Sequence, residues 1–118
     1  MMTELTEGSK WSQQWEITQP MVTVHMSRAV LSTPAMIGLI EGTCHGAVES
    51  NLDAAQTTVG THINVSHLAP ASLGEVVTVS CELIAARGRR LEFEVDVRVG
   101  DRVLSQGFHT RAIMSDLP

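Results

Sequence analysis

Apolar and polar residues alternate with a period of two over much of the second half of the chain. Between positions 91 and 99 every odd residue is apolar and every even residue is charged. Successive side chains of a strand point to opposite faces, so this segment predicts a strand with one buried and one solvated face. Positions 75–85 alternate less sharply, and positions 103–114 are predicted to form the last strand.

Short turns are predicted to join these strands in antiparallel order. Gly100-Asp101 is a Gly-X pair that suits a type II′ hairpin, and positions 86–90, which contain Gly88, form the equivalent turn before it. Earlier in the chain, positions 11–26 mix apolar and polar residues around Pro20. This favours an edge strand with an irregularity, because proline cannot donate a hydrogen bond to a sheet.

A helix is predicted from Thr33 to Val48. Ser32 and Thr33 offer side-chain oxygens that can cap its start, and Pro34 suits the first helical position. Apolar or small residues then continue for about four turns. The expected order is one strand, one helix and four antiparallel strands, which is a single α+β domain over residues 1–118 with one helix serving the whole sheet.

Glycines recur every fourth residue within this helix, at Gly38, Gly42 and Gly46. Each costs about 1 kcal/mol relative to alanine in a helix interior, so a compensating contact is expected. The spacing places all of them on one face, where the absent side chains would let another backbone approach. We therefore expect a curved sheet to enclose the helix.

Composition limits the classes of partner. Aromatic residues make up only 3% of the chain, and eight basic against thirteen acidic side chains give a net charge of −5 without a basic stripe. Nucleic acid is therefore not an expected partner. Positions 1–10 do not read as a secretory signal and no stretch approaches a membrane span, so a cytoplasmic protein with no membrane contact is expected. Cys44 and Cys81 lack metal-site or redox spacing and are predicted to be reduced core residues.

Glu41 stands out in the middle of the predicted helix. It is flanked by Ile37 and Ile40 and, one turn later, by Cys44 and His45. A carboxylate desolvated on such an apolar stripe is a candidate general base or nucleophile, whereas the alternative is an acid exposed at the seam of a dimer. His45 is one possible partner through its i,i+4 spacing.

His67 is the second candidate for proton transfer. Strict alternation over positions 59–69 places it on the more apolar face, with His62 and Asn64 on the other face. A lone inward histidine is commonly a satisfied core residue, but beside an inward glutamate it becomes a candidate for an acid/base pair. His25 is interpreted as a surface residue of a strand.

Thr33 and a group of arginines each have a structural and a functional interpretation. Thr33 could cap the helix, or its hydroxyl and the free N–H groups at the helix start could contact a substrate carbonyl that gains negative charge. Arg87, Arg89 and Arg90 place three of the eight basic residues within four positions. They form either a solvated turn or a site for a phosphate-bearing ligand.

Three separated segments of the sequence resemble the hot-dog-fold acyl-CoA thioesterases, in the branch that includes fluoroacetyl-CoA thioesterase. The resemblance extends from Leu31 to Ser115 and is carried by LSTPAMIGLIE at 31–41, VGTHINVSHLA at 59–69 and GRRL at 88–91. It implies a hot-dog fold, in which a five- or six-stranded antiparallel sheet wraps one central helix. It also implies a homodimer or higher homo-oligomer with the substrate between subunits.

The resemblance implies a site as well. The catalytic set of the branch is a hydroxyl residue at the helix start, a helix glutamate and a strand histidine, which fall on Thr33, Glu41 and His67. Gly60 matches a substrate-proximal glycine, and Arg111 matches a substrate-binding position. The resemblance implies no cofactor and no metal.

Two departures from the branch bear on the substrate. Positions 24–33 contain no Phe, Tyr or Trp where the branch has an aromatic-rich lid, so a preference for fluoroacetate is not expected. The last strand reads GFHTR at 107–111, where the branch more often has GTHER. We predict an acyl-CoA thioesterase, a hydrolase for small acyl-CoA or related thioesters. A hydratase or dehydratase on the same fold and a non-catalytic acyl-CoA-binding dimer are the alternatives.

Overall fold

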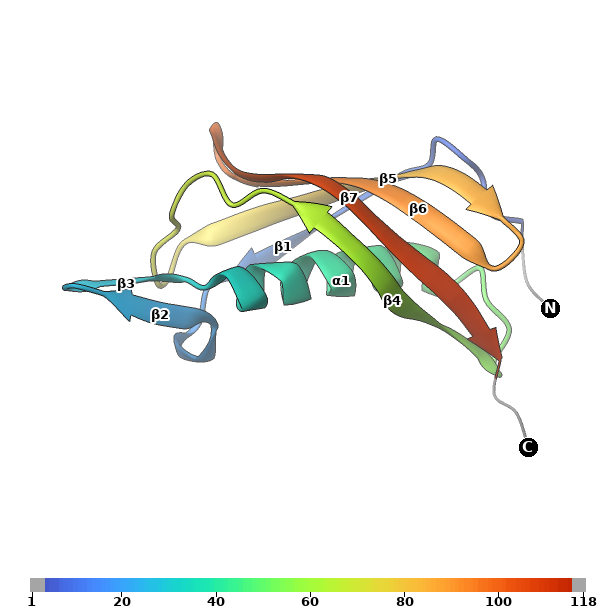
Figure 1. The fold of residues 1–118 in the computed structure, drawn as a ribbon, viewed down its shortest axis with the longest axis horizontal. Helices are drawn as coiled ribbons and strands as arrows, with labels where there is room; N and C mark the ends of the chain where they lie inside the picture. Colours follow the sequence, from blue (N-terminus) through green and yellow to red (C-terminus); the bar gives the residue numbers. More distant parts are fainter. Residues whose placement is uncertain (1–3, 116–118) are drawn as a thin grey trace.

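The chain folds as one long helix against an antiparallel sheet, with a small hairpin at one end (Figure 1). The computed structural model describes residues 4–115, so the first three residues of the polar N-terminal segment and the last three residues lie outside it. The elements in chain order are β1 (Lys10–Glu16), a 3-10 turn η1 (Gln19–Met21), β2 (Val22–His25), β3 (Arg28–Leu31), α1 (Thr33–Glu49), β4 (Gln56–Val65), β5 (Val76–Arg87), β6 (Arg90–Val99) and β7 (Arg102–Ser115).

The main sheet has five strands in the order β1-β5-β6-β7-β4, and every neighbouring pair is antiparallel. Helix α1 lies along one face of this sheet (Figure 1). Strands β1 and β4 form the two edges, and β4 follows directly after the helix in the chain. The predicted α+β class, with one central helix and a five- or six-stranded antiparallel sheet, is confirmed.

Both predicted hairpin turns are present. Gly88-Arg89 joins β5 to β6, and Gly100-Asp101 joins β6 to β7. Gly88 and Gly100 have φ of 60° and 57°, a left-handed conformation that glycine adopts without a steric penalty at the first position of a type II′ turn.

Alternating residues of the inner strands build the core, as the period-two pattern predicts. The odd residues of β6 from Leu91 to Val97 are at most 2% exposed, and they pack with buried helix residues such as Met36 and Ile40. Cys44 and Cys81 are buried in the same cluster as free thiols, in agreement with their prediction as reduced core residues. A hydrogen bond to Cys81, together with burial, raises the pKa of the Cys44 thiol.

The segment at positions 11–26 differs from its prediction as one irregular edge strand. The edge strand β1 stops at Glu16, and Pro20 lies in the 3-10 turn η1. The chain then leaves the main sheet and forms the separate β2-β3 hairpin, whose turn residue Met26 is fully exposed with φ of 58°. Pro20 suits this turn, because its φ is fixed near the helical value and it has no N–H to donate to a sheet.

In the described part of the chain, no other backbone covers the glycine face of α1, so the predicted close approach is not found within a single copy. The space where a Cβ of Gly38 would lie has nothing within 4 Å, and at Gly42 only the ring of Trp15 comes as close as 3.6 Å. The sheet instead packs against the opposite side of the helix, where Met36, Ile40 and Cys44 are fully buried. Among the residues that the structure describes, no helix combines the length and apolar character needed to cross a membrane.

Candidate functional site

The start of α1 holds the first pair of candidate groups, Thr33 and His67. The N-cap is Ser32, whose hydroxyl accepts a hydrogen bond from the Ala35 N–H at 3.2 Å. The prediction that Thr33 caps the helix is therefore wrong, and its hydroxyl is available for another contact. Thr33 Oγ1 lies 2.7 Å from His67 Nδ1. In the neutral tautomer with its proton on Nε2, this imidazole accepts the hydroxyl proton, as a base that activates a hydroxyl would do.

His67 reaches Thr33 from a loop and not from a strand. Strand β4 ends at Val65, and His67 is exposed. The β4-β7 register also shifts between Gly60 and His62, so the strict alternation assumed over positions 59–69 fails at this bulge. The predicted inward position on the apolar face is therefore wrong for His67, although its contact with Thr33 keeps it in the candidate site.

The backbone at the helix start offers fewer donors than the sequence suggests. The N–H of Ser32 is bonded to the carbonyl of Met21, the N–H of Ala35 is bonded to Ser32, and Pro34 has none. In the part of the chain that the structure describes, the Thr33 N–H is therefore the one first-turn donor left to face a ligand. It lies on the same residue as the candidate hydroxyl.

An open hollow of about 290 Å³ lies beside this pair. Thr33, His67 and Leu68 line one side of it, and Thr23 and Val30 of the β2-β3 hairpin line the other. Its volume is near the lower limit of typical ligand pockets, which suits a small acyl group better than a long chain.

Glu41 lies further along α1, and its side chain is 44% exposed. The expected burial on an apolar stripe is therefore wrong for this single chain, because Ile40 and Cys44 turn into the core while Glu41 faces the side of β4. Glu41 Oε2 lies 3.7 Å from Arg111 Nη1. The arrangement is a solvent-accessible carboxylate beside a cation.

Arg111 is held inside the sheet instead of projecting into solvent. Its side chain is 7% exposed, its Nε donates to Thr58 Oγ1 at 2.8 Å, and its Nη2 donates to the Thr58 carbonyl at 2.9 Å. Burial lowers the pKa of Arg111, whereas the nearby Glu41 carboxylate acts in the opposite direction. Only Nη1 is directed to Glu41 and to His109, whose Nε2 lies 3.1 Å away.

His109 is fixed as a neutral imidazole between two partners. Its Nδ1 lies 2.7 Å from the carbonyl of His62, which can only accept, so this nitrogen carries the proton. Nε2 is then an acceptor for Arg111. Burial, and next the positive charge of Arg111, lower the pKa of His109, while its bond to the His62 carbonyl acts against them.

Gly60 of β4 leaves the space that the Glu41 carboxylate occupies. A Cβ at this position would lie 2.5 Å from Glu41 Oε2, 3.2 Å from His109 Cε1 and 3.4 Å from Arg111 Nη1. The first of these distances is too short for a real Cβ, so a side chain at this position would displace the Glu41 carboxylate from where it lies. The residue matched to a substrate-proximal glycine thus contacts the candidate carboxylate directly.

His45 faces β4 and bonds to Thr58, while the Glu41 carboxylate lies beside Arg111. Its Nδ1 lies 2.9 Å from Thr58 Oγ1, the same hydroxyl that accepts from Arg111. The i,i+4 pairing considered from sequence is therefore replaced by a bond across to the neighbouring strand. Within residues 4–115, no three His, Cys, Asp or Glu side chains are grouped in a way that could hold a metal ion.

The candidate residues thus form two groups and not one. Thr33 and His67 are in contact at the helix start, and Glu41, Gly60 and Arg111 are in contact near its middle. Eight positions separate Thr33 from Glu41, which corresponds to about 12 Å along the helix axis. A single chain therefore presents two separate parts of the candidate site, which we call half-sites: the Thr33–His67 pair and the Glu41 carboxylate with its neighbours.

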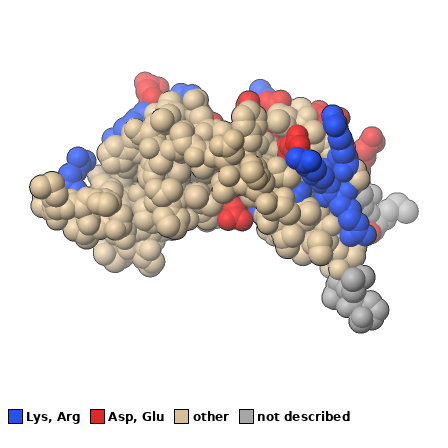
Figure 2. Space-filling view, in the orientation of Figure 1, with Lys and Arg blue, Asp and Glu red and all other residues tan. Residues whose placement is uncertain are grey.

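The β5-β6 hairpin with Arg87, Arg89 and Arg90, called the arginine turn here, lies far from the start of α1. Figure 1 places the β5-β6 hairpin at the opposite end of the molecule from the β2-β3 hairpin, and Figure 2 shows Lys and Arg side chains gathered at that end. Arg87, Arg89 and Arg90 are exposed there. Arg89 donates to the Ile113 carbonyl at 3.3 Å, and Arg90 pairs with Glu92 at 2.8 Å. In one copy, these side chains are not beside Thr33 and His67.

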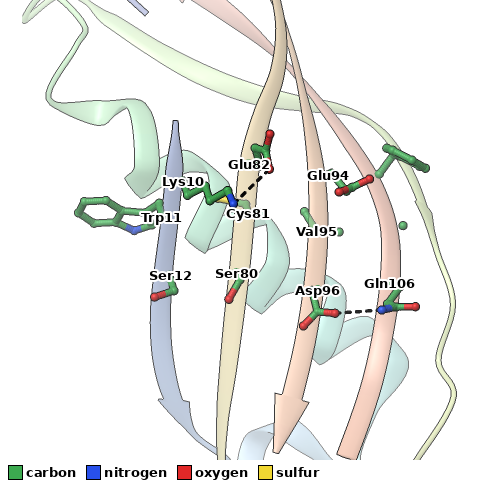
Figure 3. Close-up of a pocket in the computed structure, with 12 residues that line it drawn as sticks. Lys10, Trp11, Ser12, Ser80, Cys81, Glu82, Glu94, Val95, Asp96 and Gln106 are labelled. Atoms are coloured by element: carbon green, nitrogen blue, oxygen red, sulfur yellow. Dashed lines mark hydrogen bonds and ion pairs between the residues drawn. The ribbon is translucent and has the colours of Figure 1, made fainter. Parts of the chain in front are cut away.

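Another hollow, of about 720 Å³, contains none of the candidate residues (Figure 3). It lies over β1, β5, β6 and β7, where Lys10 is directed to Glu82 and Gln106 donates to Asp96. Its size alone does not make it the reaction site, because its acids are partly paired with neighbouring residues and it lacks the Thr33–His67 pair.

Sequence reasoning missed Thr58 as a member of the site. The signal was present in the alternation of β4, because Thr58 lies two residues before Gly60 and so shares its face, opposite the end of β7 that carries Arg111. A buried threonine on an edge strand resembles ordinary sheet composition, so its role becomes visible only with the cross-strand contacts.

Comparison with known proteins supports a common family for these features. The family model described as fluoroacetyl-CoA-specific thioesterase matches residues 15–116. The fluoroacetyl-CoA thioesterase of Streptantibioticus cattleyicolor is 36% identical over 85 residues, which cover 72% of this chain and 61% of that relative's length. A solved structure of a variant of the fluoroacetyl-CoA-specific thioesterase FlK, in complex with fluoroacetate and CoA, is 28% identical with a TM-score of 0.88, over 94% of this chain and 96% of that one.

A more distant structure supports the fold alone. A hot-dog-like protein from Thermanaerovibrio acidaminovorans is 18% identical with a TM-score of 0.82, over 92% of this chain and 83% of that one. The predicted hot-dog fold and the predicted branch are both confirmed. The chain belongs to the fluoroacetyl-CoA-specific thioesterase family.

Proposed function

We propose that this protein hydrolyses a small acyl-CoA thioester to a free acid and a thiol. The observation that carries the proposal is the 2.7 Å contact between Thr33 Oγ1 and His67 Nδ1 beside a hollow of acyl-group size, in a chain that also presents an accessible carboxylate. The family of the chain and the CoA bound to a related thioesterase variant support a CoA thioester as the substrate class.

The residues are assigned roles by what their groups can donate and accept. Glu41 either attacks the thioester carbonyl directly or removes a proton from the water that attacks it. When His67 Nδ1 carries a proton and donates a hydrogen bond to Thr33 Oγ1, the Thr33 hydroxyl hydrogen is left for the substrate carbonyl or the carboxylate, and the Thr33 N–H stabilises developing negative charge. On either route the C–S bond breaks and His67 transfers a proton to the departing thiolate. On the direct route water then hydrolyses the anhydride between Glu41 and the acyl group, so both routes consume one water and release one acid and one thiol.

The two half-sites on one helix favour a site shared between two copies. The exposed face of α1 and the neighbouring edge strand β4 are open in a single chain, and Glu41 lies on this side. A two-fold antiparallel pairing across this surface brings the helix start of one copy against the helix middle of the other. The site then combines Thr33 and His67 of one copy with Glu41 of the second. It also brings the arginine turn of the second copy nearer the CoA phosphates.

Mixing two impaired variants tests this shared site. Glu41→Gln and Thr33→Ala chains, each purified alone, are expected to retain only a small residual turnover. The two variants are then unfolded, mixed and refolded, so that hybrid dimers form. If each site takes Thr33 from one copy and Glu41 from the other, one of the two sites in a hybrid dimer is intact. If each site uses one chain only, both sites of the hybrid lack a group, and the mixture keeps only the residual turnover. Light scattering of each preparation measures whether the copies pair.

The proposed reaction is tested by thiol release from a panel of acyl-CoAs. Short acyl chains are expected to be hydrolysed faster than long ones, because the hollow at Thr33 is small. Enoyl- and hydroxyacyl-CoAs in the same panel are followed by mass spectrometry for addition or loss of water, which would indicate a hydratase. Acyl-CoA binding by calorimetry without any turnover would contradict the proposal and identify a binding protein.

A further inference from the structure

Arg111 lies close to Glu41 without forming a direct hydrogen bond to it. The separation of Nη1 and Oε2 is 3.7 Å, whereas charge-assisted N–H···O bonds are about 2.7–2.9 Å long. An arginine with a free guanidinium would close this gap and bind the carboxylate through two parallel bonds. Something therefore holds Arg111 back from Glu41.

Thr58 provides that restraint from the neighbouring strand. Its hydroxyl accepts from Arg111 Nε and its carbonyl accepts from Nη2, so one residue occupies two of the three guanidinium nitrogens. The guanidinium is planar, and two bonds at fixed points determine the direction of Nη1. Nη1 is then directed between His109 Nε2 and Glu41 Oε2.

The Thr58 hydroxyl is itself oriented by the helix that carries Glu41. Because it accepts from Arg111, its single hydrogen is available for His45 Nδ1, which lies 2.9 Å away. His45 follows Glu41 by one helical turn. The contacts thus run from the helix through His45, Thr58 and Arg111 and return to Glu41. Thr58 is only 4% exposed, so water does not compete readily for these bonds.

We propose that Thr58 is a positioning residue that keeps Arg111 beside, but not bonded to, the Glu41 carboxylate. The cation then stabilises the negative charge of Glu41 while both carboxylate oxygens remain accessible to water or the thioester. This inference rests on the proposed function only for its effect on turnover. The position of Arg111 relative to Glu41 can be measured without any substrate.

The first test replaces Thr58 with valine, which keeps the shape and removes the hydroxyl. Arg111 Nε loses its acceptor, so the guanidinium is expected to rotate and bind Glu41 directly. We expect kcat to fall by about 10- to 100-fold with KM changed less than about twofold, because a misplaced group affects the reacting state more than substrate binding. Thr58→Ser retains the hydroxyl and is expected to restore kcat to within about threefold of the parent.

Two controls separate positioning from general destabilisation. Thr57→Val makes the same change on the exposed face of the same strand and is expected to leave kcat unchanged. In a Glu41→Gln background, Thr58→Val is expected to cost no further activity, because it acts through the carboxylate that is already missing. If Thr58→Val lowers kcat equally in both backgrounds, or if Thr58→Ser is as impaired as Thr58→Val, the proposal is wrong.

The second test is structural and stands even if no thioester is hydrolysed. Crystal structures of the parent and Thr58→Val proteins should show Arg111 moving to within about 3 Å of Glu41 in the variant alone. The Nε–H signal of Arg111 in ¹⁵N spectra should shift in Thr58→Val and return in Thr58→Ser. If Thr58→Val does not fold, Thr58→Ala replaces it in both measurements. An unmoved Arg111 in a folded variant overturns the proposal, whereas absent turnover in the parent contradicts only the proposed function.

Discussion

Gly60 and Glu41 are matched so closely that a single added methyl group on the glycine would collide with the carboxylate. The Cβ would lie 2.5 Å from Glu41 Oε2, a distance that requires one of the two to move. We predict that Gly60→Ala displaces the carboxylate and lowers kcat by about 100-fold. Gly46→Ala is the matched control, since the closest atom there is 4.0 Å away. It should retain activity and stabilise the helix by about 1 kcal/mol, as thermal or urea unfolding would measure. Equal activity of the two variants would contradict the prediction.

Removing the charge of Glu41 tests whether the carboxylate takes part in the reaction. Glu41→Gln preserves the shape of the side chain and should reduce thioester turnover by at least about 100-fold, because an amide neither attacks a thioester nor accepts a proton from water. The far-ultraviolet spectrum and oligomeric state should stay unchanged. Glu49→Gln, at an exposed position near the end of the same helix, is expected to behave like the parent. Parent-like turnover in Glu41→Gln would remove this residue from the mechanism.

Thr33 and His67 should act as one unit. Thr33→Val and His67→Ala each break the 2.7 Å contact, so the double variant should lose little more activity than the worse single variant. A double-mutant cycle on kcat/KM measures this coupling. His62→Ala is the control, because its side chain is exposed and its bond to His109 is made by the backbone carbonyl, which the substitution keeps. Independent losses that multiply in the double variant would show that the contact has no role in turnover.

Much of this architecture follows from local pattern. Alternation identifies the buried face of β6, and Gly88 and Gly100 identify turns, because these signals depend on neighbours in the sequence. The choice of Ser32 over Thr33 as the N-cap and the bulge after Gly60 could not be predicted this way. Both depend on the contacts of α1 and β4 with distant segments. The function of Thr58 was missed for the same reason, since its partners are 13 and 53 positions away.

The enzyme is expected not to prefer fluoroacetyl-CoA strongly over acetyl-CoA. The β2-β3 hairpin occupies the segment before the helix, but it contains no Phe, Tyr or Trp, and Val24 and Met26 near its tip are 65% and 100% exposed. No large ring is therefore available on this hairpin to select one small acyl group over another. The ratio of kcat/KM for the two substrates, measured at equal salt, should lie within about tenfold. A ratio in the thousands would show that another part of the molecule supplies the selection.

Acid should weaken the fold through His109. The pKa of His109 in the folded chain is lowered below its ordinary value of about 6.5. As the pH falls past that value, the unfolded chain therefore binds more protons than the folded chain. The free energy of unfolding is therefore expected to be fully retained above about pH 6.5 and to decrease below it. Glu75 affects the free energy of unfolding only at lower pH, because hydrogen bonds from the Ser72 N–H and Arg102 lower the pKa of its carboxyl group. Urea unfolding from pH 7.5 to 5 should show a smaller decrease in His109→Gln, and an unchanged slope would contradict this assignment.

Strand β4 ends the sheet with ten residues whose outer backbone groups have no neighbouring strand within the described chain. An unpaired edge of this length is a template for the addition of another strand, including one from an unfolded or misaligned molecule. If two copies pair along this surface as proposed, a substitution that prevents the pairing would therefore not give a well-behaved monomer. It would give slow precipitation, and the soluble yield from expression would report whether this edge is covered before any assay is run.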